Sequence, residues 1–151
     1  VETAVIVVDA VGGLSVGAEK AWKYCEKNSL PRLLYISKTD EEKIAKWKED
    51  GNSEKIADFT DESYEQALRL LAISALGEIK RDETAVNTCM KLITDDDKAI
   101  RLAACEALKL IGTKREVDRL YFVETNETDE EVKRALLDAA VSSKERTPRF
   151  L

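Results

Sequence analysis

The sequence contains no histidine, which removes the side chain most often used as a general base and as a zinc ligand. Its three cysteines, Cys25, Cys89 and Cys105, include no pair in Cys-x-x-Cys spacing. This odd number without a pattern predicts small buried apolar residues in a reducing compartment, not disulfides. We therefore expect no metal site.

Long apolar runs and clusters of basic residues are also scarce. The longest apolar run, AVIVV, is far shorter than the ~20 residues of a membrane-spanning helix, and no signal-peptide pattern is present. The net charge is −6, without a compact basic stripe. Because nucleic-acid binding draws on clustered Lys and Arg, we expect no nucleic-acid partner. Because the apolar runs are short, we also expect no membrane partner. These absences predict a cytoplasmic protein.

No catalytic constellation is visible in the sequence. No serine or cysteine has a base in view, and no carboxylate pair has a reason to converge, so we expect no catalytic residues and no enzymatic activity. The acidic run at 95–97 lacks the alternating spacing and central glycine of a calcium loop, which favours helix capping. No cofactor is expected on these grounds.

The beginning of the chain predicts a small α/β unit. TAVIVVDA (3–10) and RLLYIS (32–37) read as strands, and VGAEKAWKYCEKNS between them reads as an amphipathic helix. This order predicts a right-handed crossover with parallel strands. Two strands and one helix leave open edges and one bare face, so we expect either the later helices or a second copy of the chain to complete the unit. The second option predicts a homodimer through the open sheet edge.

A glycine-rich turn joins the first strand to this helix. Gly12 and Gly17 bracket four residues, as in a phosphate-binding loop. Ala18 and Glu19 stand where that loop needs Lys followed by Ser or Thr, and a carboxylate there would repel a triphosphate. The segment is therefore interpreted as a tight strand-to-helix turn.

The stretch TAVIVVDAVGGLSVGAEKAWKYCEKNSLPRLLYISKTD resembles the interior of the GTPase domain of translation elongation factor G. The family's guanine-recognition loop reads Asn-Lys-x-Asp, and this chain has Ser37, Lys38, Thr39 and Asp40 there. The resemblance implies that Lys38 lies along the guanine ring and that Asp40 accepts its hydrogen bonds. The family's phosphate loop and switches have no counterpart here, so weak GDP or GTP binding without hydrolysis is the alternative function. Otherwise Lys38 and Asp40 are solvated loop residues.

The rest of the chain is helical and contains a repeat. QALRLLAISALGEI (66–79), KAIRLAACEALKLI (98–111) and EEVKRALLDAAVSS (130–143) align at an offset of 32 residues. DETAVNTCMKLI and KREVDRLYFVET precede the last two copies as partner helices, joined to them by acidic turns. Such a period with small residues at fixed positions predicts stacked helical hairpins that bury their faces only against neighbours.

Residues 53–143 resemble short HEAT-type repeats. In such folds the basic residue near the start of each second helix commonly stacks against an acidic turn residue of an adjoining repeat. Arg69, Arg101 and Lys133 occupy that position. We favour this structural role over the alternative, in which the three cations form a partner-binding surface.

The predicted organisation is therefore α/β plus α: a small parallel βαβ lobe followed by a HEAT-like array. We expect a GTPase-fragment-like unit at 1–40, a helical linker at 41–52, repeats at 53–143 and a frayed tail at 144–151. The abrupt change of pattern and the start at Val1, with Met90 the only methionine, suggest a chimeric or engineered chain. The expected function is a non-enzymatic scaffold that binds protein at most.

Overall fold

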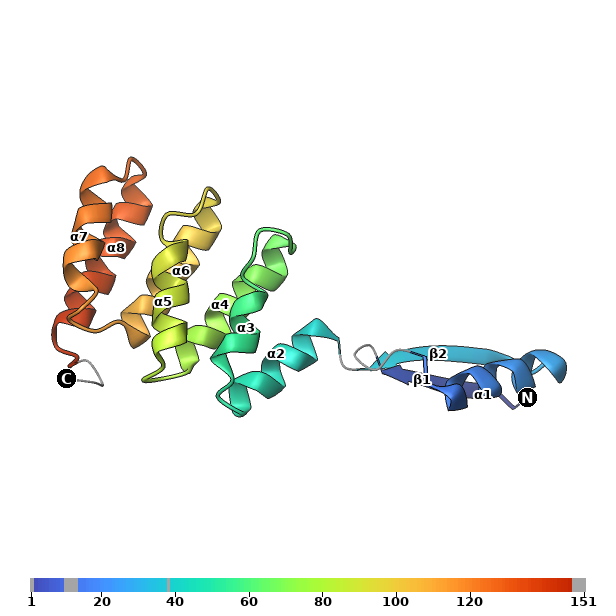
Figure 1. Ribbon diagram of the computed structural model, residues 1–151. Coiled ribbons are helices and arrows are strands. Elements are labelled where there is room, and N and C mark those ends of the chain that lie inside the picture. Colours follow the sequence, from blue (N-terminus) through green and yellow to red (C-terminus); the bar gives the residue numbers. More distant parts are fainter. Residues whose placement is uncertain (1, 10–13, 38, 148–151) are drawn as a thin grey trace. The chain divides into compact units, whose positions relative to one another are not determined.

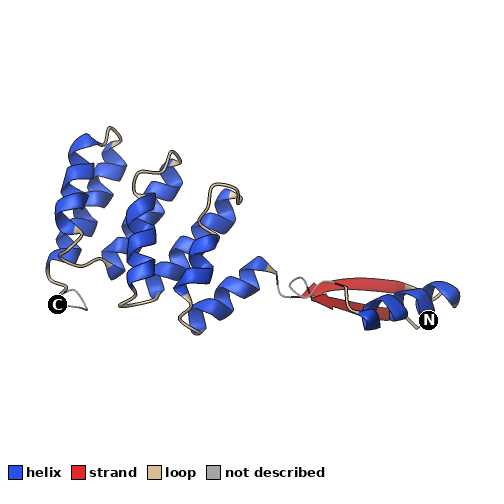
Figure 2. Cartoon of the chain, viewed as in Figure 1, coloured by secondary structure: helices blue, strands red, loops and turns tan. Residues whose placement is uncertain are grey.

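The chain forms two compact units, Val1–Lys43 and Ile44–Leu151, in a computed structural model that describes residues 2–9, 14–37 and 39–147 (Figure 1). The boundary lies inside helix α2 (Asp40–Glu49). Each unit has its own cluster of buried apolar side chains. The expected fold class, a parallel βαβ unit followed by a helical array, is confirmed (Figure 2).

The first unit consists of strand β1 (Ala4–Asp9), helix α1 (Val16–Lys27) and strand β2 (Arg32–Ser37). The strands are parallel, in a register that pairs Ala4 with Arg32. Helix α1 begins after Ser15, whose hydroxyl accepts a hydrogen bond from the Ala18 backbone N–H at 3.1 Å. Gly12 lies outside the described residues, so the turn before α1 is described only from Leu14 onward.

Helix α1 covers only one face of this sheet. The buried cluster of the unit is Ile6, Ala18 and Cys25, so the core is small. On the opposite face, Val5 and Val7 alternate with Ile6 along β1, and their register partners on β2 are Leu33 and Tyr35. All four side chains are more than half exposed. We call these four residues the open sheet face. The apolar run therefore has the composition of a doubly covered strand, but a single layer covers it.

The second unit is a stack of helical hairpins (Figure 1). Its helices are α3 (Ser53–Asp58), α4 (Gln66–Glu78), α5 (Glu83–Leu92), α6 (Lys98–Ile111), α7 (Val117–Asn126) and α8 (Glu130–Lys144). The second helices of the hairpins stack in the order α4, α6, α8, and each pairs with its first helix. We number the hairpins 1 (α3–α4), 2 (α5–α6) and 3 (α7–α8).

The acidic turns cap the second helices of hairpins 2 and 3, as expected. The Asp97 carboxylate accepts from the Ala99 N–H at 2.8 Å, and the Asp129 carboxylate accepts from two backbone N–H groups. In hairpin 1 the corresponding residue is Glu65, whose side chain makes no capping bond. The acidic turns are thus part of the fold, which agrees with the absence of a calcium-loop pattern.

Small residues at fixed repeat positions let the second helices pack closely. Ala75, Ala107 and Ala139, which share one repeat position, are all buried. At the amino end of the stack, Ile44 of α2 is also buried, and the Trp47 ring lies 5.8 Å from that of Phe59. The stack is therefore covered at its first hairpin by the second half of α2. No helix in the described ranges is long and apolar enough to cross a bilayer.

Candidate protein-binding surfaces

Arg69 joins the turn of hairpin 1 to the turn of hairpin 2. Its Nε donates to the Thr60 carbonyl oxygen at 2.9 Å, and its Nη2 donates to Asp95 Oδ2 at 2.5 Å. The Arg69 side chain is nearly buried and that of Asp95 is largely so. The Arg69 guanidinium therefore forms a contact between neighbouring repeats.

Arg101 occupies the same position one repeat later. Its Nη1 donates to the carbonyl oxygens of Asp95 at 2.9 Å and Asp96 at 3.1 Å. Its Nε lies 3.2 Å from Glu127 Oε2, close enough for an ion pair but without the alignment of a hydrogen bond. Arg101 thus links hairpins 2 and 3 as Arg69 links hairpins 1 and 2.

Lys133 is the third member of this set, on α8. Its Nζ is 3.6 Å from Glu130 of its own helix, and its side chain is 31% exposed. Over residues 39–147, no acidic side chain of a following hairpin faces it. Of the three cations considered as a partner surface, two are therefore engaged between repeats, and Lys133 is open to an incoming group.

One apolar side chain beside Lys133 is exposed where its repeat equivalents are buried. Ile73, Cys105 and Leu137 stand at one repeat position, with exposed fractions of 0%, 1% and 38%. Val141, one turn further along α8, is 59% exposed. We call Lys133, Leu137 and Val141 the outer face of α8. It is the surface on which a neighbouring repeat packs elsewhere in the stack.

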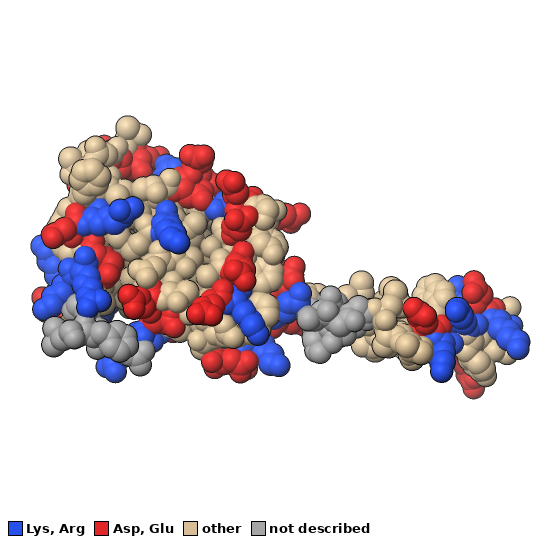
Figure 3. Space-filling model, viewed as in Figure 1, with Lys and Arg blue, Asp and Glu red and all other residues tan. Residues whose placement is uncertain are grey.

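The two edges of the stack differ in charge. The turns within hairpins carry acidic residues, and Figure 3 shows acidic side chains along one edge of the second unit. The loops between hairpins each contain Lys-Arg followed by an acid, as Lys80–Arg81–Asp82 and Lys114–Arg115–Glu116. The sequence did not reveal this basic edge because the two pairs are far apart along the chain.

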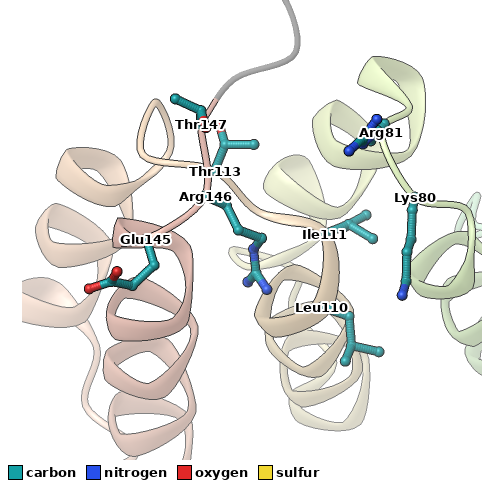
Figure 4. A pocket seen from close by; sticks show the side chains of 8 residues that line it. All are labelled: Lys80, Arg81, Leu110, Ile111, Thr113, Glu145, Arg146 and Thr147. Atoms are coloured by element: carbon teal, nitrogen blue, oxygen red, sulfur yellow. The ribbon is translucent and has the colours of Figure 1, made fainter.

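A cavity of about 500 Å³ lies at the basic edge (Figure 4). Its lining residues are Lys80, Arg81, Leu110, Ile111, Thr113, Glu145, Arg146 and Thr147. Arg146 donates from Nε to the Gly112 carbonyl at 2.7 Å and from Nη2 to the Lys109 carbonyl, at the carboxyl end of α6. Arg146, which lies in the segment expected to be frayed, is therefore hydrogen-bonded to the end of α6.

The residues expected to contact guanine are only partly described. Lys38 lies outside the described residues. Asp40 is the first residue of α2, and its Oδ1 is 2.8 Å from Lys43 Nζ. Thr39 and Glu42 form a reciprocal cap at this helix start, since the Thr39 N–H donates to Glu42 Oε2 at 3.1 Å and the Glu42 N–H donates back to Thr39 Oγ1. Guanine recognition at this position stays a prediction.

The cysteines are buried, as expected from their spacing. Cys25, Cys89 and Cys105 are all free thiols with little exposure. Burial raises the pKa of the Cys89 and Cys105 thiols to about 12, so neither supplies a thiolate at neutral pH. No group of three or more potential metal ligands comes together among the described residues.

Stacked hairpins whose second helices form a continuous row define the class of α-helical repeat proteins. The sequence model of the family described as HEAT repeats matches residues 53–140, and the chain belongs to this family. The expected HEAT-type array is thereby confirmed. No curated protein and no solved structure matches the chain. The resemblance of the first unit to elongation factor G stays a prediction.

Proposed function

We propose that the chain is a non-enzymatic scaffold that binds another protein through the outer face of α8. One observation carries this proposal: Leu137 is 38% exposed at a repeat position that is fully buried in the preceding hairpins. Exposed apolar side chains beside a charged group favour a protein surface as the ligand. The HEAT family supports the same conclusion, since arrays of stacked repeats present extended surfaces to other proteins.

Site-specific photo-crosslinking tests the proposal. A photoreactive residue at Val141 is expected to capture a defined protein from extracts of the source cells, and Leu137→Glu is expected to abolish capture. The control carries the same group at Asn87, which is exposed on α5, the first helix of hairpin 2. Identical products from both positions, or none from Val141, would refute binding at this face.

For the first unit, we propose that a second copy of the chain covers the open sheet. The support is the exposure of Val5, Val7, Leu33 and Tyr35, together with strand edges that pair only with each other in the described ranges. Sedimentation velocity is expected to show a concentration-dependent dimer. Val7→Lys combined with Tyr35→Lys should yield a monomer. A wild-type chain that stays monomeric at all concentrations would exclude this dimer.

We propose further that the chain is a chimera joined near residues 40–52. The division into units at Lys43 and Ile44, each with its own buried cluster, supports such a join. Residues 44–151 expressed alone should then unfold cooperatively at nearly the temperature measured for that unit in the whole chain. Loss of cooperative unfolding on removal of residues 1–43 would argue against two independent parts.

A further inference from the structure

One kind of contact recurs at the same repeat position between successive hairpins. A cation on a second helix reaches an acidic side chain in the turn of the next hairpin. The pairs are Arg69 with Asp95 and Arg101 with Glu127. In both hairpins the acidic partner stands two residues before the aspartate that caps the second helix, Asp97 or Asp129. An acidic side chain followed two residues later by the capping aspartate therefore marks a hairpin that packs on a preceding repeat.

The outer face of α8 carries a cation at the same repeat position. Lys133 stands 32 residues after Arg101 and carries the same charge, but its ion partner is Glu130 on its own helix. Leu137 and Val141 continue the packing surface toward the carboxyl end of α8. The face is thus continuous in position and chemistry with the two interfaces already formed inside the stack.

We propose that the outer face of α8 binds a helical hairpin of a partner protein, which stacks as a fourth repeat and pairs an Asp or Glu of its turn with Lys133. This inference rests on the proposed function and specifies the chemistry of the partner. The partner's acidic residue lies two positions before the residue that caps its second helix. The first turn of the partner's second helix carries an apolar side chain that covers Leu137. In hairpin 2 the first turn of α6 likewise carries an apolar side chain, Ile100, which is buried.

A second copy of this chain does not present such a hairpin. In hairpin 1 the corresponding position, two residues before Glu65 at the start of α4, is Ser63. The amino end of the stack is also covered, because Ile44 of α2 is buried against it. The acidic side chains of hairpins 2 and 3 are already paired with Arg69 and Arg101. No hairpin in the described part of this chain is therefore available to cover the face, and the occupant that we propose is a hairpin from a different protein.

The test uses the whole chain and a synthetic peptide of residues 112–147, which contains hairpin 3. This peptide carries Glu127 two residues before Asp129, and in the chain its Arg146 donates to the carbonyl of Lys109, the repeat equivalent of Val141. Fluorescence anisotropy is expected to show saturable binding, with a gain of helical circular dichroism. Lys133→Glu in the chain should weaken binding by about tenfold or more, and Glu127→Lys in the peptide should restore it.

The matched control is Lys91→Glu, the same charge change at an exposed lysine of α5 in hairpin 2, away from the outer face of α8. It should alter affinity by less than about twofold. The inference is overturned if the peptide does not bind, or if binding is indifferent to Lys133→Glu. If crosslinking at Val141 still captures a protein in that event, the proposed function stands and only the hairpin chemistry of the partner is wrong.

Discussion

Gly77 of α4 lies directly against Ala107 of α6, where an added β-carbon would stand 3.1 Å from both Cα and Cβ of the alanine. A large side chain would force the two second helices apart. We predict that Gly77→Leu lowers the free energy of unfolding by about 1–3 kcal/mol in urea denaturation. Ser74→Leu, on the exposed side of the same helix, should change it by less than about 0.5 kcal/mol. Equal effects would contradict this close packing.

The Arg69–Asp95 pair should be the strongest ion pair between repeats. Arg69→Ala leaves a largely buried carboxylate without its partner, so we expect a loss of about 3 kcal/mol. Lys98→Ala removes an exposed ammonium that contacts Asp129 and Glu131, with an expected loss of about 0–1 kcal/mol. A double-mutant cycle with Asp95→Ala should show that the two residues are coupled. Additive losses would contradict the pairing.

Acid should weaken the caps of the second helices. The hydrogen bond from Lys98 holds the pKa of the Asp129 carboxyl below its ordinary value of 3.8, and one from Gln66 does the same for Asp97. A pKa lowered in the folded state gives stability that is full above the ordinary value and is lost as the pH falls through the folded value. Urea midpoints should therefore fall below about pH 4.

The variant Asp129→Asn tests this assignment. It removes the titrating carboxylate but keeps a capping side chain, so the variant should be less stable at neutral pH and lose less stability in acid. Its matched control is Asp138→Asn on the exposed side of α8, which should keep the wild-type acid sensitivity. An Asp129→Asn variant with the wild-type pH dependence would show that the cap does not contribute.

Calorimetric titration with GDP, and with GTP plus magnesium, tests the alternative function. Asp40 starts α2 and pairs with Lys43, a role that needs no nucleotide. We therefore expect no heat up to millimolar nucleotide. Micromolar binding that Asp40→Ala removes would instead support the guanine contact implied by the resemblance to elongation factor G.

Much of the fold follows from local sequence patterns. The run AVIVV and the amphipathic segment after it predict the strand–helix–strand unit, because burial on one face leaves a period in the sequence. The 32-residue offset predicts the stack and the general role of Arg69. The cap formed by Thr39 and Glu42 was missed, although Thr-x-x-Glu is a known signal for a helix start.

Other features depend on which segments become neighbours. Lys80 and Arg146 line one cavity although they are far apart in the sequence, so no local pattern predicts it. Leu137 and Cys105 align at one repeat position, and the exposure of Leu137 comes only from the lack of a following hairpin in the described part of the chain. The sequence alignment identifies these equivalent residues, but only the structure shows that Cys105 is buried in an interface and that Leu137 is exposed.

Backbone amide chemical shifts of the whole chain, recorded during titration with the 112–147 peptide, show whether the end of the stack is the binding surface. We predict that the shifted signals cluster around Lys133, Leu137 and Val141 on α8. Signals of hairpin 1 and of the first unit should stay unchanged. Shifts centred on the open sheet face or on the basic cavity, with α8 unaffected, would contradict the claim that the end of the stack is the binding surface.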